Sequence, residues 1–170
     1  MNKFLFTQFL AFIILSTFSF TIFSAQNINP EDACKYLTDE RFRGNLTYHE
    51  NKRSGNYSCA SLRKPIDKGE PSTSDLRYSV KGNKSSAEQI SLLMRMNSFK
   101  VSVPVLKEFS RVSGVIYSKA FGSALPEEVN KTILSAQPGK WTSDEYTIIL
   151  DRKFDKTRTY ELDFIIQMPN

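Results

Sequence analysis

Residues 160–168 have the sequence YELDFIIQM, in which apolar side chains recur at every second position. This alternation is typical of a β-strand that covers a hydrophobic core with one face and meets water with the other. Residues 146–150, YTIIL, place three apolar side chains in the same way, and a charged connection, residues 151–158, joins the two segments. The sequence therefore predicts an antiparallel hairpin whose second strand turns Glu161 and Asp163 toward solvent.

Helical spacing of apolar residues is clearest just before this hairpin. Residues 105–121 place their apolar side chains on one face and Lys, Glu and Arg on the other, which predicts an amphipathic helix. Gly122 is expected to end it, because glycine readily adopts the left-handed conformation of a helix C-cap. A further helix is expected to begin at Leu125–Pro126 and to stop before Pro138–Gly139.

A third helix is expected over residues 85–99. Ser85 and Glu88 have the spacing of a capping box, in which each side chain bonds the backbone amide of the other residue. The apolar residues that follow, from Ile90 to Phe99, would cover a broad face of such a helix. We therefore expect it to be buried on more than one side.

The N-terminal half predicts smaller elements. Asn29 and Pro30 are typical of the first positions of a helix, and this short helix would carry Cys34. Strands are expected at residues 57–62 and 76–80, and loops at 38–56 and 63–75. The order of elements indicates an α+β fold: a two-layer domain with an antiparallel sheet of about four strands packed against three to four helices.

The first 25 residues have the features of an export signal. Lys3 is their only charged side chain, residues 4–23 are almost wholly apolar, and small residues permit cleavage after Ala25. Residues 1–25 are thus expected to be a signal peptide and residues 26–170 a single domain in the periplasm or outside the cell. The alternative is an inner-membrane anchor through residues 4–23, since this segment approaches the roughly 20 residues that span a bilayer.

Two cysteines, Cys34 and Cys59, both lie in the expected mature chain. An even pair in an exported chain favours one disulfide over two reactive or metal-bound thiols, which would call for CxxC spacing or a nearby His. Closing a loop of this length would stabilise the fold by about 3.5 kcal/mol on the chain-entropy model. We therefore expect a disulfide-stapled domain.

The charge of the chain excludes few partners. The full sequence carries 23 Lys and Arg against 18 Asp and Glu; loss of Lys3 leaves 22 against 18, a net charge of +4. Both signs are scattered along the chain, so ordinary solvation is expected, with at most weak attraction to anionic membrane surfaces. Nucleic acid is not an expected partner, because export removes the chain from it.

Motifs for most chemistries are missing from the sequence. His49 is the single histidine, and no Ser sits in a GxSxG turn, so neither a catalytic triad nor a metal site is expected. No P-loop or GxGxxG occurs, and no cofactor is expected. Two carboxylate pairs, Glu127 with Glu128 and Glu161 with Asp163, are the candidates for acid and base work on a cell-wall sugar.

Five short segments of the mature chain form a further pattern: Asp32-Ala33-Cys34, Tyr57-Ser58-Cys59, Leu76-Arg77-Tyr78-Ser79-Val80, Leu125-Pro126 and Pro138-Gly139-Lys140-Trp141. In these segments the chain resembles a loosely defined family of small exported proteobacterial proteins of unknown function. The resemblance implies a bacterial envelope location and an α+β fold, and it implies no activity. The expected function is therefore a non-enzymatic protein that binds another envelope or exported protein, for example as an immunity protein or inhibitor; the alternative is a carboxylate-dependent cell-wall hydrolase.

Overall fold

The computed structural model describes most of the expected mature domain. The signal peptide predicted at residues 1–25, and the alternative anchor at 4–23, lie outside the described residues. Within the ranges that are described, no helix is long and apolar enough to cross a membrane. The described residues are 27–52, 54–67, 74–96, 102–154 and 159–169.

One antiparallel sheet organises the described chain. Its strands follow the order β1-β2-β4-β5-β8-β7-β6, and β3 pairs with β4 beside this path. The helices are α1 (Pro30–Cys34), α2 (Val103–Phe121) and α3 (Glu127–Leu134). The strands are β1 (Gly44–Glu50), β2 (Tyr57–Ser61), β3 (Lys64–Pro65), β4 (Ser74–Gly82), β5 (Ala87–Met96), β6 (Gly139–Thr142), β7 (Thr147–Phe154) and β8 (Tyr160–Gln167).

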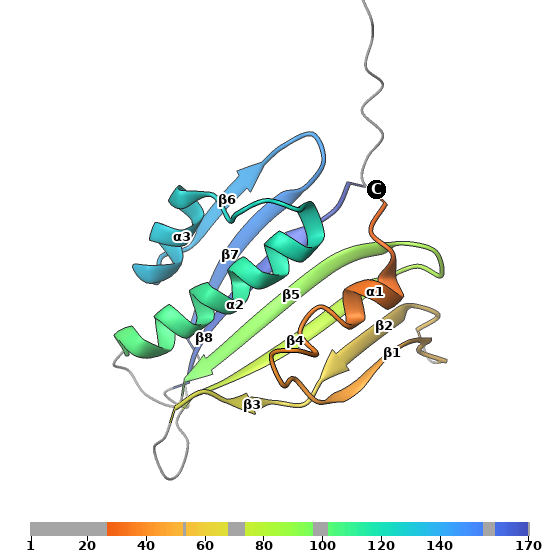
Figure 1. The fold of residues 1–170 in the computed structure, drawn as a ribbon, viewed down its shortest axis with the longest axis horizontal. Coiled ribbons are helices and arrows are strands. Elements are labelled where there is room, and N and C mark those ends of the chain that lie inside the picture. The colour runs from red at the N-terminus through yellow and green to blue at the C-terminus, as the bar shows by residue number, and fades with distance from the viewer. Residues whose placement is uncertain (1–26, 53, 68–73, 97–101, 155–158, 170) are drawn as a thin grey trace, which may run out of the picture.

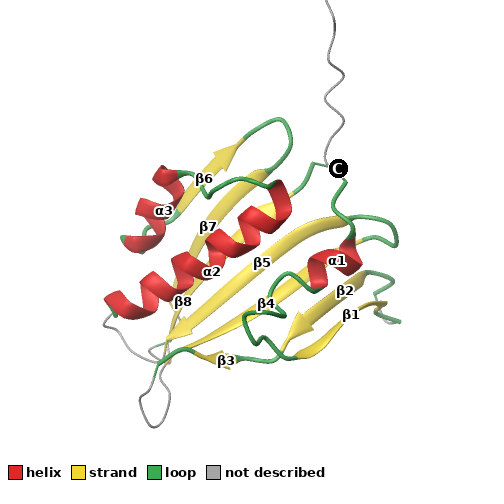
Figure 2. Cartoon of the chain, viewed as in Figure 1, coloured by secondary structure: helices red, strands yellow, loops and turns green. Residues whose placement is uncertain are grey.

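All three helices lie on the same face of the sheet. In Figure 1, α2 runs beside β5 and lies in front of β8, α3 lies near β6 and β7, and α1 lies over β4. Figure 2 shows the same separation by element type, with the red helices in one layer and the yellow strands behind them. The predicted two-layer α+β architecture is therefore confirmed, but the sheet has eight strands instead of about four.

The helix predicted over residues 85–99 is wrong in its described part, because residues 87–96 form the central strand β5; residues 97–99 lie outside the described residues. Asn83, not Ser85, organises the turn before it: its Oδ1 accepts hydrogen bonds from the backbone amides of Ser85 and Ser86, at 2.9 and 3.0 Å. Within the strand, the fully buried side chains stand two apart and point toward the helices. They are Ile90, Leu92, Met94 and Met96.

Three other strands were also missed by the sequence pattern. β1 lies in the stretch expected to be a loop; it is an edge strand whose residues are mostly exposed on both sides, so no alternation marks it. β3 consists of two residues in the second predicted loop. β6 has four residues and pairs with β7 alone. Each of these strands is too short or too exposed to solvent to produce an alternation of apolar and polar residues in the sequence.

Several other predictions are confirmed. Asn29 caps α1 through its Oδ1, which accepts from the amide of Glu31 at 2.9 Å. Gly122 ends α2 with a φ of 69°, the left-handed conformation expected of a C-cap glycine. β7 and β8 form the predicted hairpin, with Leu150 opposite Phe164.

The disulfide Cys34–Cys59 joins α1 to β2, with the two Cα atoms 6.1 Å apart. Both cysteines are buried in the core, at 0% and 1% exposure. The Tyr78 hydroxyl reinforces the same junction, because it donates a 2.6 Å hydrogen bond to the carbonyl of Ala33 in α1. The short first helix is thus fixed to the sheet covalently and by a buried hydrogen bond.

Candidate functional site

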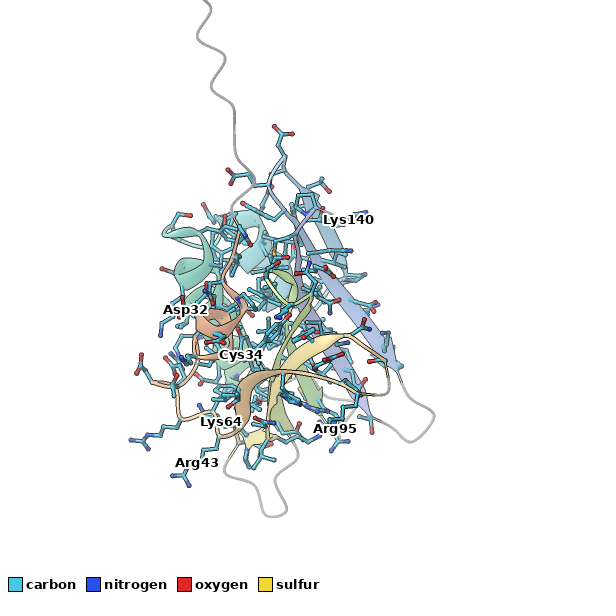
Figure 3. All side chains as sticks on the ribbon, turned by 90° about the vertical axis from the view of Figure 1, so that its right-hand side faces the viewer. Asp32, Cys34, Arg43, Lys64, Arg95 and Lys140 are labelled. Atoms are coloured by element: carbon cyan, nitrogen blue, oxygen red, sulfur yellow. A yellow bond between two sulfur atoms is a disulfide. The ribbon has the colours of Figure 1, made fainter. Side chains whose placement is uncertain are left out.

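The side of the sheet that faces away from the helices carries no covering element among the described residues. We call it the helix-free face. Figure 3 turns the molecule so that the labelled Arg95 and Lys140 lie on the opposite side from Asp32 of α1. The face is formed by Ser58 and Ala60 (β2), Asp75, Arg77, Ser79 and Lys81 (β4), Gln89, Ser91, Leu93 and Arg95 (β5), Glu161, Asp163, Ile165 and Gln167 (β8), Thr147, Ile149, Asp151 and Lys153 (β7), and Lys140 and Thr142 (β6).

The centre of the helix-free face is apolar. Ile165 stands directly opposite Ile149 on the neighbouring strand. Leu93 pairs with Asp163, which places it diagonally beside Ile165. All three aliphatic side chains are half-buried. A solvated sheet face usually presents polar residues, so three aliphatic side chains among the polar residues of this face are unusual.

The β4 side of the face is cationic. Arg77 and Lys81 are exposed, and neither forms an ion pair within the described part of the chain. Arg95 is half-buried and approaches the carboxylate of Asp75 at 3.5 Å; Asp75 also pairs with Arg63 at 2.6 Å. Arg77 and Lys81 are therefore available to an incoming group.

The β7–β8 side is acidic. Asp163 stands directly opposite Asp151, and Glu161 lies two residues before Asp163 on the same face. Lys153 offsets this charge in part, with its Nζ 3.0 Å from Asp151. Burial raises the pKa of Asp163 to about 6, Lys153 lowers it, and the charge of Asp151 raises it further.

Two buried polar atoms on this face have no hydrogen-bond partner. Asp163 Oδ1 and Arg95 Nε are two of the three such side-chain atoms among the described residues; the third is the Ser113 hydroxyl in α2. Folded proteins satisfy most buried polar groups, and each unmet group costs about 1–3 kcal/mol. Both atoms belong to charged side chains of the helix-free face, whose polar groups are therefore incompletely satisfied in the described chain.

A shallow hollow of about 370 Å³ lies on the β2–β8 part of the face. Arg77, Lys81 and Asp163 contribute charged groups to its lining, and the hydroxyls of Ser79 and Ser91 bond one another at 2.8 Å within it. No aromatic ring lines it. Sugar-binding and nucleobase-binding sites usually stack their ligand on such rings, so the lining is better suited to a protein surface than to either ligand.

The two predicted carboxylate pairs do not form one site. Glu127 and Glu128 are exposed at the start of α3, on the helix side, where Glu127 pairs with Lys131 at 2.6 Å. Glu161 and Asp163 lie on the helix-free face. The predicted solvent exposure of this second pair needs correction, because both carboxylates are half-buried.

His49 lies in β1 and is exposed. Its Nδ1 lies 2.9 Å from the carbonyl oxygen of Thr47 and 3.5 Å from the side-chain amide nitrogen of Asn45. Ser58 is its cross-strand neighbour, and among the described residues the ring contacts no carboxylate within hydrogen-bond distance. The part of the chain that the structure describes contains no group of three His, Cys, Asp or Glu residues placed to hold a metal ion.

Sequence reasoning missed most of the helix-free face. Arg77, Leu93 and Asp151 had no assigned role, and Leu93 was placed in a helix. The available signal was the alternation within residues 87–96, where Ile90, Leu92, Met94 and Met96 stand two apart. That spacing would have placed Leu93 and Arg95 together on the opposite face.

The fold and the face define a class: an α+β protein whose antiparallel sheet is covered by helices on one side and open on the other. The chain matches no protein-family model, no curated protein and no solved structure. The resemblance to small exported proteobacterial proteins therefore stays a prediction, and the candidate site rests on geometry alone.

The raised pKa of Asp163 predicts a pH-dependent stability. The pKa rises from 3.8 to about 6 on folding, so the folded chain holds this proton more tightly than the unfolded chain. Asp163 therefore contributes most below pH 4, and about 2 to 3 kcal/mol of the free energy of unfolding is lost as the pH rises through 6. The Asp163→Asn variant should not show this loss. Its free energy of unfolding should therefore rise relative to that of the wild type between pH 4 and pH 7, as measured by urea unfolding.

A matched control for this measurement is Glu128→Gln, which removes an exposed carboxylate from α3. The difference in free energy of unfolding between this variant and the wild type should stay constant over the same pH range. Equal pH profiles of the wild type and Asp163→Asn would show that burial does not hold the Asp163 proton.

Proposed function

We propose that this chain is an exported, non-enzymatic binding protein that holds another exported or envelope protein against its helix-free face. The single observation that carries the proposal is the composition of that face. Three aliphatic side chains on β5, β8 and β7 lie among cationic groups on β4 and acidic groups on β8 and β7, and two buried polar atoms of this face have no hydrogen-bond partner among the described residues. An immunity protein or inhibitor would use such a surface.

The face also specifies the chemistry of the partner. Leu93, Ile149 and Ile165 require apolar groups on the partner, because removing their remaining aliphatic surface from water is favourable in proportion to the area buried. Arg77 on β4 requires an acidic group, and Asp163 and Asp151 on β8 and β7 require a basic group. The partner surface therefore carries acidic groups over β4 and basic groups over β8 and β7, next to apolar groups.

Two features support export to the periplasm or beyond the cell. The buried disulfide Cys34–Cys59 is of the kind that forms and persists in oxidising compartments. Residues 1–25 have the composition of a signal peptide. An exported binding protein needs both properties, since it must cross the inner membrane and then stay folded without cytoplasmic chaperones.

Variants on the two sides of the sheet test this proposal. Envelope proteins captured by the wild-type domain should be lost with Ile149→Gln, which removes part of the apolar centre, and with Arg77→Asp, which reverses a rim charge. We expect affinity to fall by at least about tenfold for Ile149→Gln, since residues at the centre of an interface dominate binding. Quantitative pull-down followed by calorimetry with the identified protein measures this.

The control variant is Glu127→Lys, which reverses an exposed charge on α3 of the helix side. It should capture the same proteins as the wild type. Proteins that are captured equally by all variants bind elsewhere and do not support the proposal. Capture that survives both helix-free-face substitutions but is lost with Glu127→Lys would move the binding site to the helices.

A second candidate function is the cell-wall hydrolase, and one observation favours it. Asp151 and Asp163 are direct cross-strand neighbours, and the pKa of Asp163 is raised to about 6. Glycosidases use such a pair, with the raised carboxyl as general acid. The hollow beside the pair is shallow, which favours the binding role. Peptidoglycan digestion that is present in the wild type and abolished by Asp163→Asn, with the fold intact, would select the hydrolase.

A further inference from the structure

We propose that in the absence of its partner the chain covers its helix-free face with the helix-free face of a second copy, forming a twofold symmetric dimer. This inference goes beyond the proposed function, although it uses the same surface. It follows from the order of charges across the sheet, which is complementary to itself under one particular rotation.

Two rows of side chains carry these charges across the four central strands. Within each row, the residues are cross-strand neighbours and therefore lie at the same height along the strands. In the strand order β4, β5, β8, β7, the first row is Asp75, Arg95, Glu161 and Lys153, and the second is Arg77, Leu93, Asp163 and Asp151. When a row is reversed and laid over the original row, each charged residue faces either a residue of opposite charge or a neutral one.

A twofold axis that runs parallel to the strands, between β5 and β8, performs this reversal. It lays β4 of one copy over β7 of the other and β5 over β8, while each row keeps its height along the strands. The facing pairs are then Asp75 with Lys153, Arg95 with Glu161, and Arg77 with Asp151, each formed twice by symmetry. The aliphatic residues lie near the axis, where Leu93 faces Asp163, Ile165 faces Ser91 and Ile149 faces Ser79 of the second copy.

The alternative rotation does not produce this match. A twofold axis perpendicular to the strands would lay each strand over its own copy and would place one end of the sheet over the other. The row at the other end of the strands carries one charge, in the order Lys81, Gln89, Gln167 and Thr147. The charged first row would then face a nearly neutral one, so the charge pattern selects the parallel axis.

The like-charge contact between Asp163 and Asp151 fits the same arrangement. In the single chain, Asp163 faces Asp151 and the Lys153 beside it, and neither hydrogen-bonds its Oδ1. In the dimer, Arg77 of the second copy comes over Asp151 and supplies positive charge to both carboxylates. The dimer thus relieves a like-charge contact that exists in each separate chain.

The size of the face sets the expected strength of the dimer. Strands about 4.8 Å apart and residues that rise about 3.4 Å each give a six-strand patch of about 24 by 20 Å. This is smaller than a typical stable interface, which covers about 800 Å² on each partner. A dimer of this size with six ion pairs should dissociate at micromolar concentration and should weaken as salt is added.

Charge reversal at one facing pair gives a decisive test. Arg77→Asp places two acids opposite each other in the homodimer, and Asp151→Arg places two bases opposite each other. Each variant alone should therefore be monomeric, with a dimer weakened by at least about tenfold. An equimolar mixture of the two should dimerise again, because the mixed pair restores an acid opposite a base at both positions.

Sedimentation velocity, from low micromolar to near-millimolar protein and at low and high salt, measures this. The control Lys107→Asp on the exposed side of α2 should dimerise like the wild type. A wild-type chain that stays monomeric throughout, single variants that remain dimeric, or folded variants that fail to pair when mixed would each overturn the proposal.

The same variants separate this inference from the proposed function. A monomeric wild type whose envelope partner is lost with Arg77→Asp would overturn the dimer and leave the binding function in place. Restored pairing in the mixture, together with partner capture that is unaffected by every variant of the face, would confirm the dimer and overturn the binding function.

Discussion

Leu92→Gln should unfold the chain or nearly so, whereas Leu93→Gln should fold with almost wild-type stability. Leu92 is fully buried against the helices. Its replacement removes a core side chain, at a cost of about 2–5 kcal/mol, and buries an amide without partners, at about 1–3 kcal/mol more. The sum is comparable with the whole stability of a typical domain, about 5–15 kcal/mol. Leu93 points to the helix-free face, where glutamine meets water, so we expect a change below about 1 kcal/mol.

Urea unfolding, followed by circular dichroism and by the fluorescence of Trp141, the single tryptophan, measures both variants. Dilute protein should be used, so that association through the face does not contribute. If residues 85–99 formed a helix, Leu92 and Leu93 would both lie on its broad apolar face, and both substitutions would be costly. Similar large losses in the two variants would therefore contradict the strand assignment of β5.

The misassignment of β5 shows where sequence reasoning fails in this chain. Met, Leu and Gln, which fill this segment, favour helices, and the Ser85–Glu88 spacing added a start signal. Tertiary structure overrides these local preferences, because β5 lies between β4 and β8 and bonds both of them. One of these partners, β8, is far away in sequence, whereas β4 directly precedes β5, so a local window contains only part of the information that makes this segment a strand.

The hairpin and α2 were predictable for the opposite reason. Each of these elements buries one face and leaves the other in contact with solvent. The buried faces include Phe164 and Ile166 on β8 and Phe109 and Ile116 on α2. The period of the apolar residues then reports the element directly. β1 lacks this contrast, because most of its residues are exposed on both sides of an edge strand.

The candidate site was less predictable than the fold. Glu161 and Asp163 were identified from their shared strand face, but Asp151 was assigned to a charged connection. The opposition of Asp151 and Asp163 depends on the register of the β7–β8 pairing, which places these two residues across from one another. Register, and with it the order of charges across four strands, can be read from the structure and not from the spacing of residues in the chain.

Removal of the disulfide is the second substitution for which we expect a large effect. The Cys34→Ala, Cys59→Ala double variant should lose about 3 to 4 kcal/mol of unfolding free energy. The lost crosslink closes a loop between residues separated by 25 positions, and the chain-entropy model assigns about 3.5 kcal/mol to it. The small cavities left by two sulfur atoms add to the loss, because both cysteines are fully buried.

Urea unfolding with and without a reductant isolates the contribution of the bond itself. Reductant should lower the unfolding midpoint of the wild type to near that of the double variant and should leave the variant unchanged. Because the disulfide is buried under α1, reduction should require unfolding first and should be slow in the absence of urea. A wild type that keeps its midpoint after complete reduction would show that Tyr78 and the packing of α1 hold this junction without the crosslink, and export would then lose one of its two supports.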